Sequence, residues 1–249
     1  MTEQEWMESA DPESMLVFLK IKRPKPGSGK WPTLSERKER LFACACCRRI
    51  WPQFVDERSR RAIEFAERYA DGKLTLEELT VAAAGAYSAA TDGKAYDNDD
   101  VAAPEYAALN TIGIYDANGE ITTMTPSFFA LNAADNAASS IANRANPETP
   151  GEGLWYAVFA AEKQAQAQLL RDLVGNPFRP VTFGDSWVTP NILEMAKEIY
   201  DTQEFDRMPK LADALKEAGC NSTDILKHCR GPGPHVKGCW LVDAVLGRE

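Results

Sequence analysis

The stretch LWYAVFAAEKQAQAQLLRDLVG, residues 154–175, has the strongest periodicity of the chain. Apolar side chains recur in it every three or four residues, which is the spacing that places them on one face of a helix. A glycine follows the last apolar turn, at Gly175, and glycine is the residue that most often ends a helix. The stretch therefore predicts one long helix, and it sets the pattern for the rest of the chain.

Further helix starts are marked by residues whose side chains cap the first turn. Thr33 with Glu36 and Thr75 with Glu78 both fit the capping-box spacing, and Asp56 precedes another periodic segment. No alternation of strand and helix appears that would indicate a parallel sheet. The sequence predicts a mainly α fold, a multi-helix globular bundle.

The middle of the chain has a weaker pattern. Residues 112–115 and 121–124 flank Asp-Ala-Asn-Gly, a turn sequence, so a small β-hairpin near 112–124 is an alternative there. We expect a single mostly helical domain over residues 1–249. The alternative is two lobes, 1–90 and 154–249, joined by an irregular, inserted middle at 91–153.

Composition excludes several classes of protein. With 249 residues and 44% hydrophobic residues, the chain can bury a substantial core. No secretory signal and no apolar run of about 18 residues is present, so we expect a cytoplasmic protein without a membrane partner. Six cysteines are too few for a disulfide scaffold and indicate reduced thiols or a metal site.

Charge is unevenly distributed. The whole chain has a net charge of −9, yet residues 20–61 hold thirteen Lys or Arg against four acidic residues. One interpretation is a nucleic-acid face, and the arginines that would contact phosphates are Arg48, Arg49, Arg58, Arg60 and Arg61. The alternative is that these side chains pair with acidic groups of the same fold or form the solvated side of two helices.

The segment HCRGPGPHVKGC, residues 228–239, is the strongest chemical signal. It holds both histidines and two of the six cysteines, and two Gly-Pro pairs stiffen it. Thiols and imidazoles on a rigid loop are typical zinc ligands. We predict a site built from Cys229, His235 and Cys239 with one thiol of Cys44 or Cys47, which requires the loop to fold back onto the earlier helix.

The thiols and imidazoles of the chain are also compatible with alternatives to that quartet. His228, Cys46 and Cys220 belong to the wider pool of metal-ligand candidates, and an iron–sulfur cluster is less suited than zinc because histidine would replace thiolate. Buried cysteines also serve as small apolar side chains. A thiol nucleophile with a histidine base could be drawn from Cys229 or Cys239 with His228 or His235.

Four segments carry a family resemblance. They are DPESMLVFL at 11–19, LFACACCRRIW at 41–51, GNPFRPV at 175–181 and HCRGPGPHVKGCW at 228–240. Together they resemble a paralogous family of planctomycete proteins for which no activity is known. The chain differs from that family at 91–125. The resemblance implies no catalytic or binding residue.

Function is predicted from these features together. We expect a non-enzymatic helical interaction or adaptor protein that binds an unknown protein partner and whose C-terminal loop is pinned by a structural zinc ion. The first alternative is a nucleic-acid-binding protein that uses residues 20–61. The second is a metal- or thiol-dependent enzyme, which would need an open coordination position or a thiol of lowered pKa.

Overall fold

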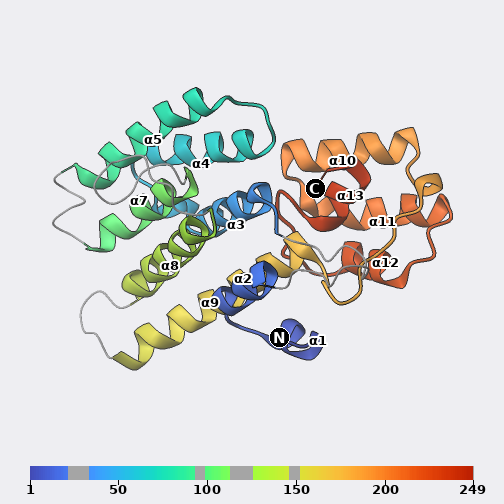
Figure 1. The fold of residues 1–249 in the computed structure, drawn as a ribbon, viewed down its shortest axis with the longest axis horizontal. Coiled ribbons are helices and arrows are strands. Elements are labelled where there is room, and N and C mark those ends of the chain that lie inside the picture. Colours follow the sequence, from blue (N-terminus) through green and yellow to red (C-terminus); the bar gives the residue numbers. More distant parts are fainter. Residues whose placement is uncertain (22–33, 93–98, 113–125, 146–151, 249) are drawn as a thin grey trace. The chain divides into compact units, whose positions relative to one another are not determined.

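The computed structural model describes residues 1–21, 34–92, 99–112, 126–145 and 152–248. Within these ranges the chain forms helices and no strand, which confirms the prediction of a mainly α, multi-helix fold (Figure 1). Beyond Ile112, the hairpin considered near 112–124 lies outside the described residues. No helix in the described ranges is long and apolar enough to cross a lipid bilayer.

The helices divide into two compact units. One unit comprises residues 1–8, 19–33 and 168–249, and we call it the terminal unit. The other comprises residues 9–18 and 34–167, and we call it the central unit. Residues 1–8 thus belong with the C-terminal part of the chain. Whether the chain counts as one domain or two stays a prediction.

The central unit is built on close helix packing. Its helices are α2 (Pro12–Ile21, in part), α3 (Glu36–Arg49), α4 (Glu57–Ala70), α5 (Leu76–Thr91), α7 (Asp99–Ile112), α8 (Pro126–Ala145) and the first part of α9 (Glu152–Val174). Helix α8 packs against both α7 and α3, and α4 packs against α5. The buried faces are rich in alanine and cysteine, whose small side chains allow the helix axes to approach closely.

Local capping explains where these helices begin. Thr75 and Glu78 form the expected capping box of α5, and Asp56 caps α4 by accepting a hydrogen bond from the Arg58 amide. The prediction for α3 was wrong. Its N-cap is Ser35, whose side chain accepts a hydrogen bond from the Lys38 amide, so the helix starts after a residue that can cap it without the Thr33–Glu36 box.

The terminal unit has a separate apolar core. Its helices are α1 (Glu3–Glu8), the last part of α9, α10 (Pro190–Thr202), α11 (Met208–Glu217), α12 (Thr223–Arg230) and α13 (Trp240–Leu246). Figure 1 shows α10 to α13 gathered together, and α10 packs against both α13 and α11. Ile199, Tyr200 and Leu241 are fully buried in this core. It supports the segment that carries both histidines.

The long helix α9 is confirmed, but its apolar face is only partly buried. Leu169, Leu170 and Leu173 in its last turns are buried, whereas Leu154 and Tyr156 near its start are 52% and 63% exposed. Gly175 ends the helix with φ +74°, a left-handed conformation that favours glycine. The last turn of α9 is therefore fixed, and it carries Asp172.

Candidate metal centre

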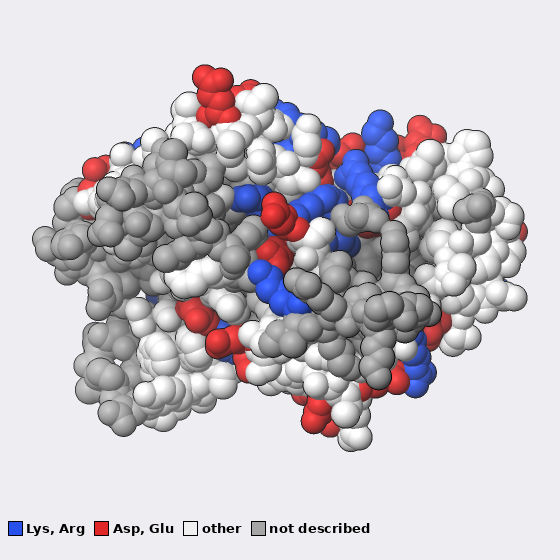
Figure 2. Space-filling view, viewed as in Figure 1, with Lys and Arg blue, Asp and Glu red and all other residues white. Residues whose placement is uncertain are grey.

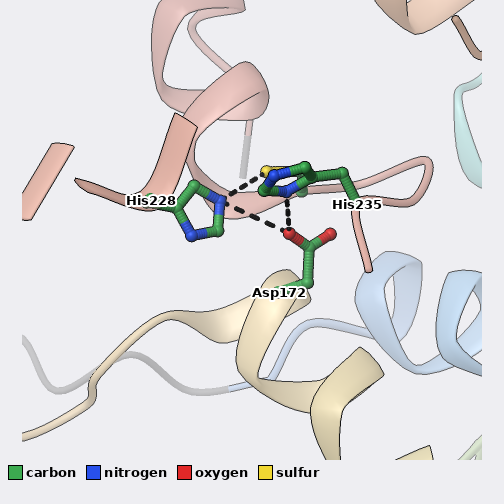
Figure 3. A group of neighbouring side chains, drawn as sticks. Asp172, His228 and His235 are labelled. Atoms are coloured by element: carbon green, nitrogen blue, oxygen red, sulfur yellow. Dashed lines mark hydrogen bonds and ion pairs between the residues drawn. The ribbon is translucent and has the colours of Figure 1, made fainter. Parts of the chain in front are cut away.

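Four potential metal ligands converge within the terminal unit. Asp172 lies on the last turn of α9, His228 on α12, His235 in the Gly-Pro loop and Cys239 directly before α13. One ligand atom from each of the four residues lies within 4.8 Å of the others. Figure 3 shows both imidazole rings directed toward the Asp172 carboxylate. A cluster of this composition can hold a metal ion.

Glycine and proline shape the loop that carries His235. The loop leaves α12 at Gly231 and turns through Gly233 and Gly238, both of which have a left-handed φ. A Cβ atom at Gly233 would lie 3.0 Å from the backbone nitrogen of His235, so a larger residue would be strained at this φ of +82° and would require the loop to shift. These turns bring His235 and Cys239 back toward His228 on α12.

The donor atoms are at hydrogen-bonding distances from one another. His235 Nδ1 lies 2.8 Å from Asp172 Oδ1, and His228 Nε2 lies 3.3 Å from the same oxygen. His228 Nε2 also lies 3.1 Å from Cys239 Sγ. Ligands of a tetrahedral zinc ion are separated by about 3.3 to 3.6 Å, given the usual zinc–ligand bond lengths. Three of the six separations are equal to these values or a few tenths of an ångström shorter, and all six lie within 4.8 Å.

The second oxygen of the carboxylate has its own partner. The Val236 amide donates a hydrogen bond of 2.8 Å to Asp172 Oδ2, which leaves Oδ1 as the oxygen that faces the two rings. Metal-binding carboxylates are commonly oriented by a second hydrogen bond of this kind. The backbone of the loop therefore fixes the direction of the carboxylate.

Burial and neighbouring groups shift the pKa values of the two acidic ligands in different directions. Burial alone would raise the pKa of Asp172, whose side chain is 3% exposed, but the hydrogen bonds from His228 and His235 hold that pKa below its usual value. Burial raises the pKa of the Cys239 thiol well above its usual value, and the Asp172 carboxylate raises it further. Without a metal ion, Asp172 is ionised and Cys239 remains a thiol at neutral pH.

The ring of His228 is oriented by Trp240. The indole Nε1–H donates a hydrogen bond of 3.3 Å to His228 Nδ1, so in this arrangement the proton of the neutral ring lies on Nε2. The same Nε2 faces both Cys239 and Asp172. A thiol–histidine–carboxylate relay needs the thiol on one ring nitrogen and the carboxylate on the other. This geometry, together with the buried thiol of raised pKa, does not suit nucleophilic catalysis by Cys239.

Sequence reasoning identified part of this cluster. Two predicted ligands, His235 and Cys239, lie in it, together with His228 from the wider pool of candidates. The predicted ligand Cys229 is fully buried on α12 but does not belong to the group. Burial raises the pKa of Cys229 to about 12, as expected for a thiol that packs as an apolar side chain.

The other two predicted ligands lie in the central unit. Cys44 and Cys47 are buried in α3 and are not part of the group. Cys44 Sγ lies 3.8 Å from the Ile63 carbonyl oxygen, and burial raises the pKa of Cys47 well above its usual value. Their surroundings are those of small buried side chains. The terminal unit supplies four donors without them.

Asp172 was missed, although the sequence holds one signal for it. An acidic residue in the last turn of a helix lies near the partial negative charge of the helix C-terminus, which is electrostatically unfavourable. Asp172 occupies such a position, three residues before Gly175. A residue placed against the helix dipole needs a compensating partner, and here the compensation comes from the two histidines.

The arginines considered for nucleic-acid contact have partners within the protein. Arg48 forms two hydrogen bonds with Glu67, and Arg49 forms two with Glu162. Arg58 pairs with Asp56 and Asp92, Arg60 pairs with Glu57, and Arg61 lies over the ring of Phe65. In Figure 2 basic side chains lie beside acidic ones. These contacts favour intramolecular pairing as the role of these five arginines.

Comparisons with known proteins add no assignment. Models of protein families, curated proteins and solved structures were searched, and none of them matches this chain. The resemblance to the planctomycete family therefore stays a prediction.

Proposed function

We propose that the chain is a non-enzymatic helical interaction protein whose C-terminal loop is fastened by a structural zinc ion. The ligands are Asp172, His228, His235 and Cys239. The observation that carries the proposal is the convergence of these four donors from α9, α12, the Gly-Pro loop and the start of α13. An ion at this point would join all four segments.

Zinc suits this set of donors best. A thiolate and two imidazoles are ligands of intermediate softness, and they are poor ligands for magnesium or calcium, which prefer oxygen. Four donors match the tetrahedral coordination that zinc adopts in structural sites. A single cysteine in the group is too few for an iron–sulfur cluster, which is held mainly by thiolates.

The number of protein ligands favours a structural role over a catalytic one. Catalytic zinc sites keep one position for water or substrate, whereas structural sites have four protein ligands. Here four side chains face one point, and the two acidic ones, Asp172 and Cys239, are buried. With all four coordinated, no position is left for a substrate.

The same side chains could also form a hydrogen-bond network without a metal ion. His228 Nε2 faces both Asp172 Oδ1 and Cys239 Sγ. A zinc ion would satisfy the nitrogen, the oxygen and the sulfur together. It would also move the ring proton to Nδ1, so the hydrogen bond from Trp240 would be lost on loading.

The interaction role is supported by the surface of α9. Leu154 and Tyr156 are more than half exposed near the start of this helix, and Phe128 on α8 is 46% exposed. Exposed apolar and aromatic side chains of this kind can contribute to a surface that contacts another protein. The fastened loop would keep the terminal unit folded while this part of the central unit makes the contact.

Elemental analysis of purified protein tests the metal directly. We expect one equivalent of zinc per chain in the wild type and in Cys229→Ala, and a loss of most of it in Cys239→Ala. Cys229 is the matched control because it is an equally buried thiol of the same unit outside the group. Wild-type protein that retains no zinc after reconstitution and removal of excess metal would contradict the proposal.

A further inference from the structure

The short N-terminal helix is attached to the turn of α9 that carries one of the ligands. Arg171, the residue before Asp172, donates two hydrogen bonds to the carbonyl oxygen of Trp6, with lengths of 3.0 and 2.7 Å. The indole of Trp6 is fully buried and donates a hydrogen bond of 3.1 Å to the Gly175 carbonyl oxygen. Helix α1 thus holds both ends of the last turn of α9.

A second contact links the same turn to the histidine side of the centre. Gly175 lies against the ring of Trp240, since a Cβ atom there would be 3.3 Å from the indole. Trp240 in turn contacts His228, with ring centroids 4.9 Å apart. Trp6, Gly175, Trp240 and His228 therefore form a continuous series of contacts within the terminal unit.

Polar contacts add to the attachment of α1. Glu3 accepts a hydrogen bond of 2.7 Å from Asn176 and forms an ion pair of 2.6 Å with Arg179. The helix itself has six residues, which is too short to persist in water without a surface to pack on. Its folded state therefore depends on the α9 turn and the loop that follows.

We propose that docking of α1 and binding of the metal ion are coupled, so that α1 acts as a removable brace of the metal centre. This inference rests on the proposed function. With α1 docked, Arg171 and Gly175 are fixed and Asp172 is held in its binding position. Without α1, that turn is free to fray and the ligand must be ordered when the ion binds. By linkage, the ion must strengthen the docking of α1 by the same factor.

Two variants of the same helix test the coupling. Trp6→Ala removes the buried indole, and Met7→Ala changes a neighbouring side chain that is 53% exposed. Zinc affinity is measured by competition with a chromophoric chelator. We expect Trp6→Ala to weaken zinc binding by about fivefold or more, the lower range of typical coupling, and Met7→Ala to leave it unchanged. Equal affinity in a folded Trp6→Ala protein would overturn the coupling.

A second measurement needs no variant. Hydrogen exchange of the α1 amides in wild-type protein is compared with zinc and with chelator, and we expect slower exchange with zinc. Exchange that is the same in both conditions overturns the coupling while leaving the zinc site in place. Wild-type protein that binds no zinc overturns both the coupling and the proposed function.

Discussion

Replacing Cys239 and Cys229 separately distinguishes a metal ligand from a buried thiol. Both side chains are fully buried in the terminal unit, and each loses one sulfur atom on substitution by alanine. Only Cys239 belongs to the group of four donors. The difference between the two variants therefore isolates the contribution of the ion from the cost of the cavity.

The expected magnitudes are well separated. Removing one buried atom of this size costs about 0.5–1.5 kcal/mol, as for loss of a methyl group, and this cost is common to both variants. A metal ion whose free concentration is about 1,000 times its dissociation constant stabilises the folded state by about 4 kcal/mol. Cys239→Ala would lose this stabilisation. In a unit of about 100 residues, this difference corresponds to about 15 °C or more in melting temperature.

Thermal unfolding, with and without chelator, measures this difference. We expect chelator to lower the melting temperature of the wild type and of Cys229→Ala, and to have little effect on Cys239→Ala, which has already lost the ion. If all three proteins respond to chelator to the same extent, or if the two variants are destabilised equally without it, the reasoning about the centre is refuted.

Four further predictions follow from the described contacts. Burial raises the pKa of Glu105 to about 7, so the unfolding free energy should fall as pH rises from about 4.5 to 7. Glu105→Gln should remove this slope in pH-dependent denaturation. Arg49→Met should lower the free energy of unfolding in urea by about 3 kcal/mol, because it leaves the carboxylate of Glu162 buried without its ion pair. An unchanged free energy of unfolding would instead favour a role of Arg49 in nucleic-acid contact. The double variant Cys44→Ser and Cys47→Ser should retain its zinc by elemental analysis, whereas loss of the ion would support the ligands predicted from the sequence. A thiol reagent should label none of the six buried cysteines in native protein and all of them in denaturant with chelator, and rapid labelling of one thiol in native protein would favour the thiol enzyme.

The helical fold was predictable because its signals are local. The capping box at Thr75 and the cap at Asp56 each depend on residues within one turn, and the structure has both. The same kind of local signal was misleading at α3, where Thr33 with Glu36 fits the capping-box spacing but Ser35 is the N-cap. Local patterns thus indicate that a helix exists more securely than they indicate where it begins.

The site was only partly predictable, because its ligands come from segments that are far apart in the sequence. His235 and Cys239 follow from the loop sequence, in which stiff Gly-Pro pairs keep donors close together. Asp172 comes from a distant helix, and only packing of the terminal unit brings it to the histidines. The Cys44 and Cys47 spacing misdirected the ligand choice, since thiols in an alanine-rich helix are also favoured for their size.

Charge balance gives a further reason why these four side chains belong together. A carboxylate as buried as Asp172 is costly to keep ionised unless positive charge or several hydrogen bonds compensate it. One zinc ion bound to a carboxylate, a thiolate and two neutral imidazoles forms a group of zero net charge. The ion would neutralise Asp172 and would also supply the positive charge that Cys239 needs to lose its proton, against the burial that otherwise raises its pKa. Neither Asp172 nor Cys239 reaches a neutral net charge with the ion on its own, so loss of either ligand should abolish metal binding.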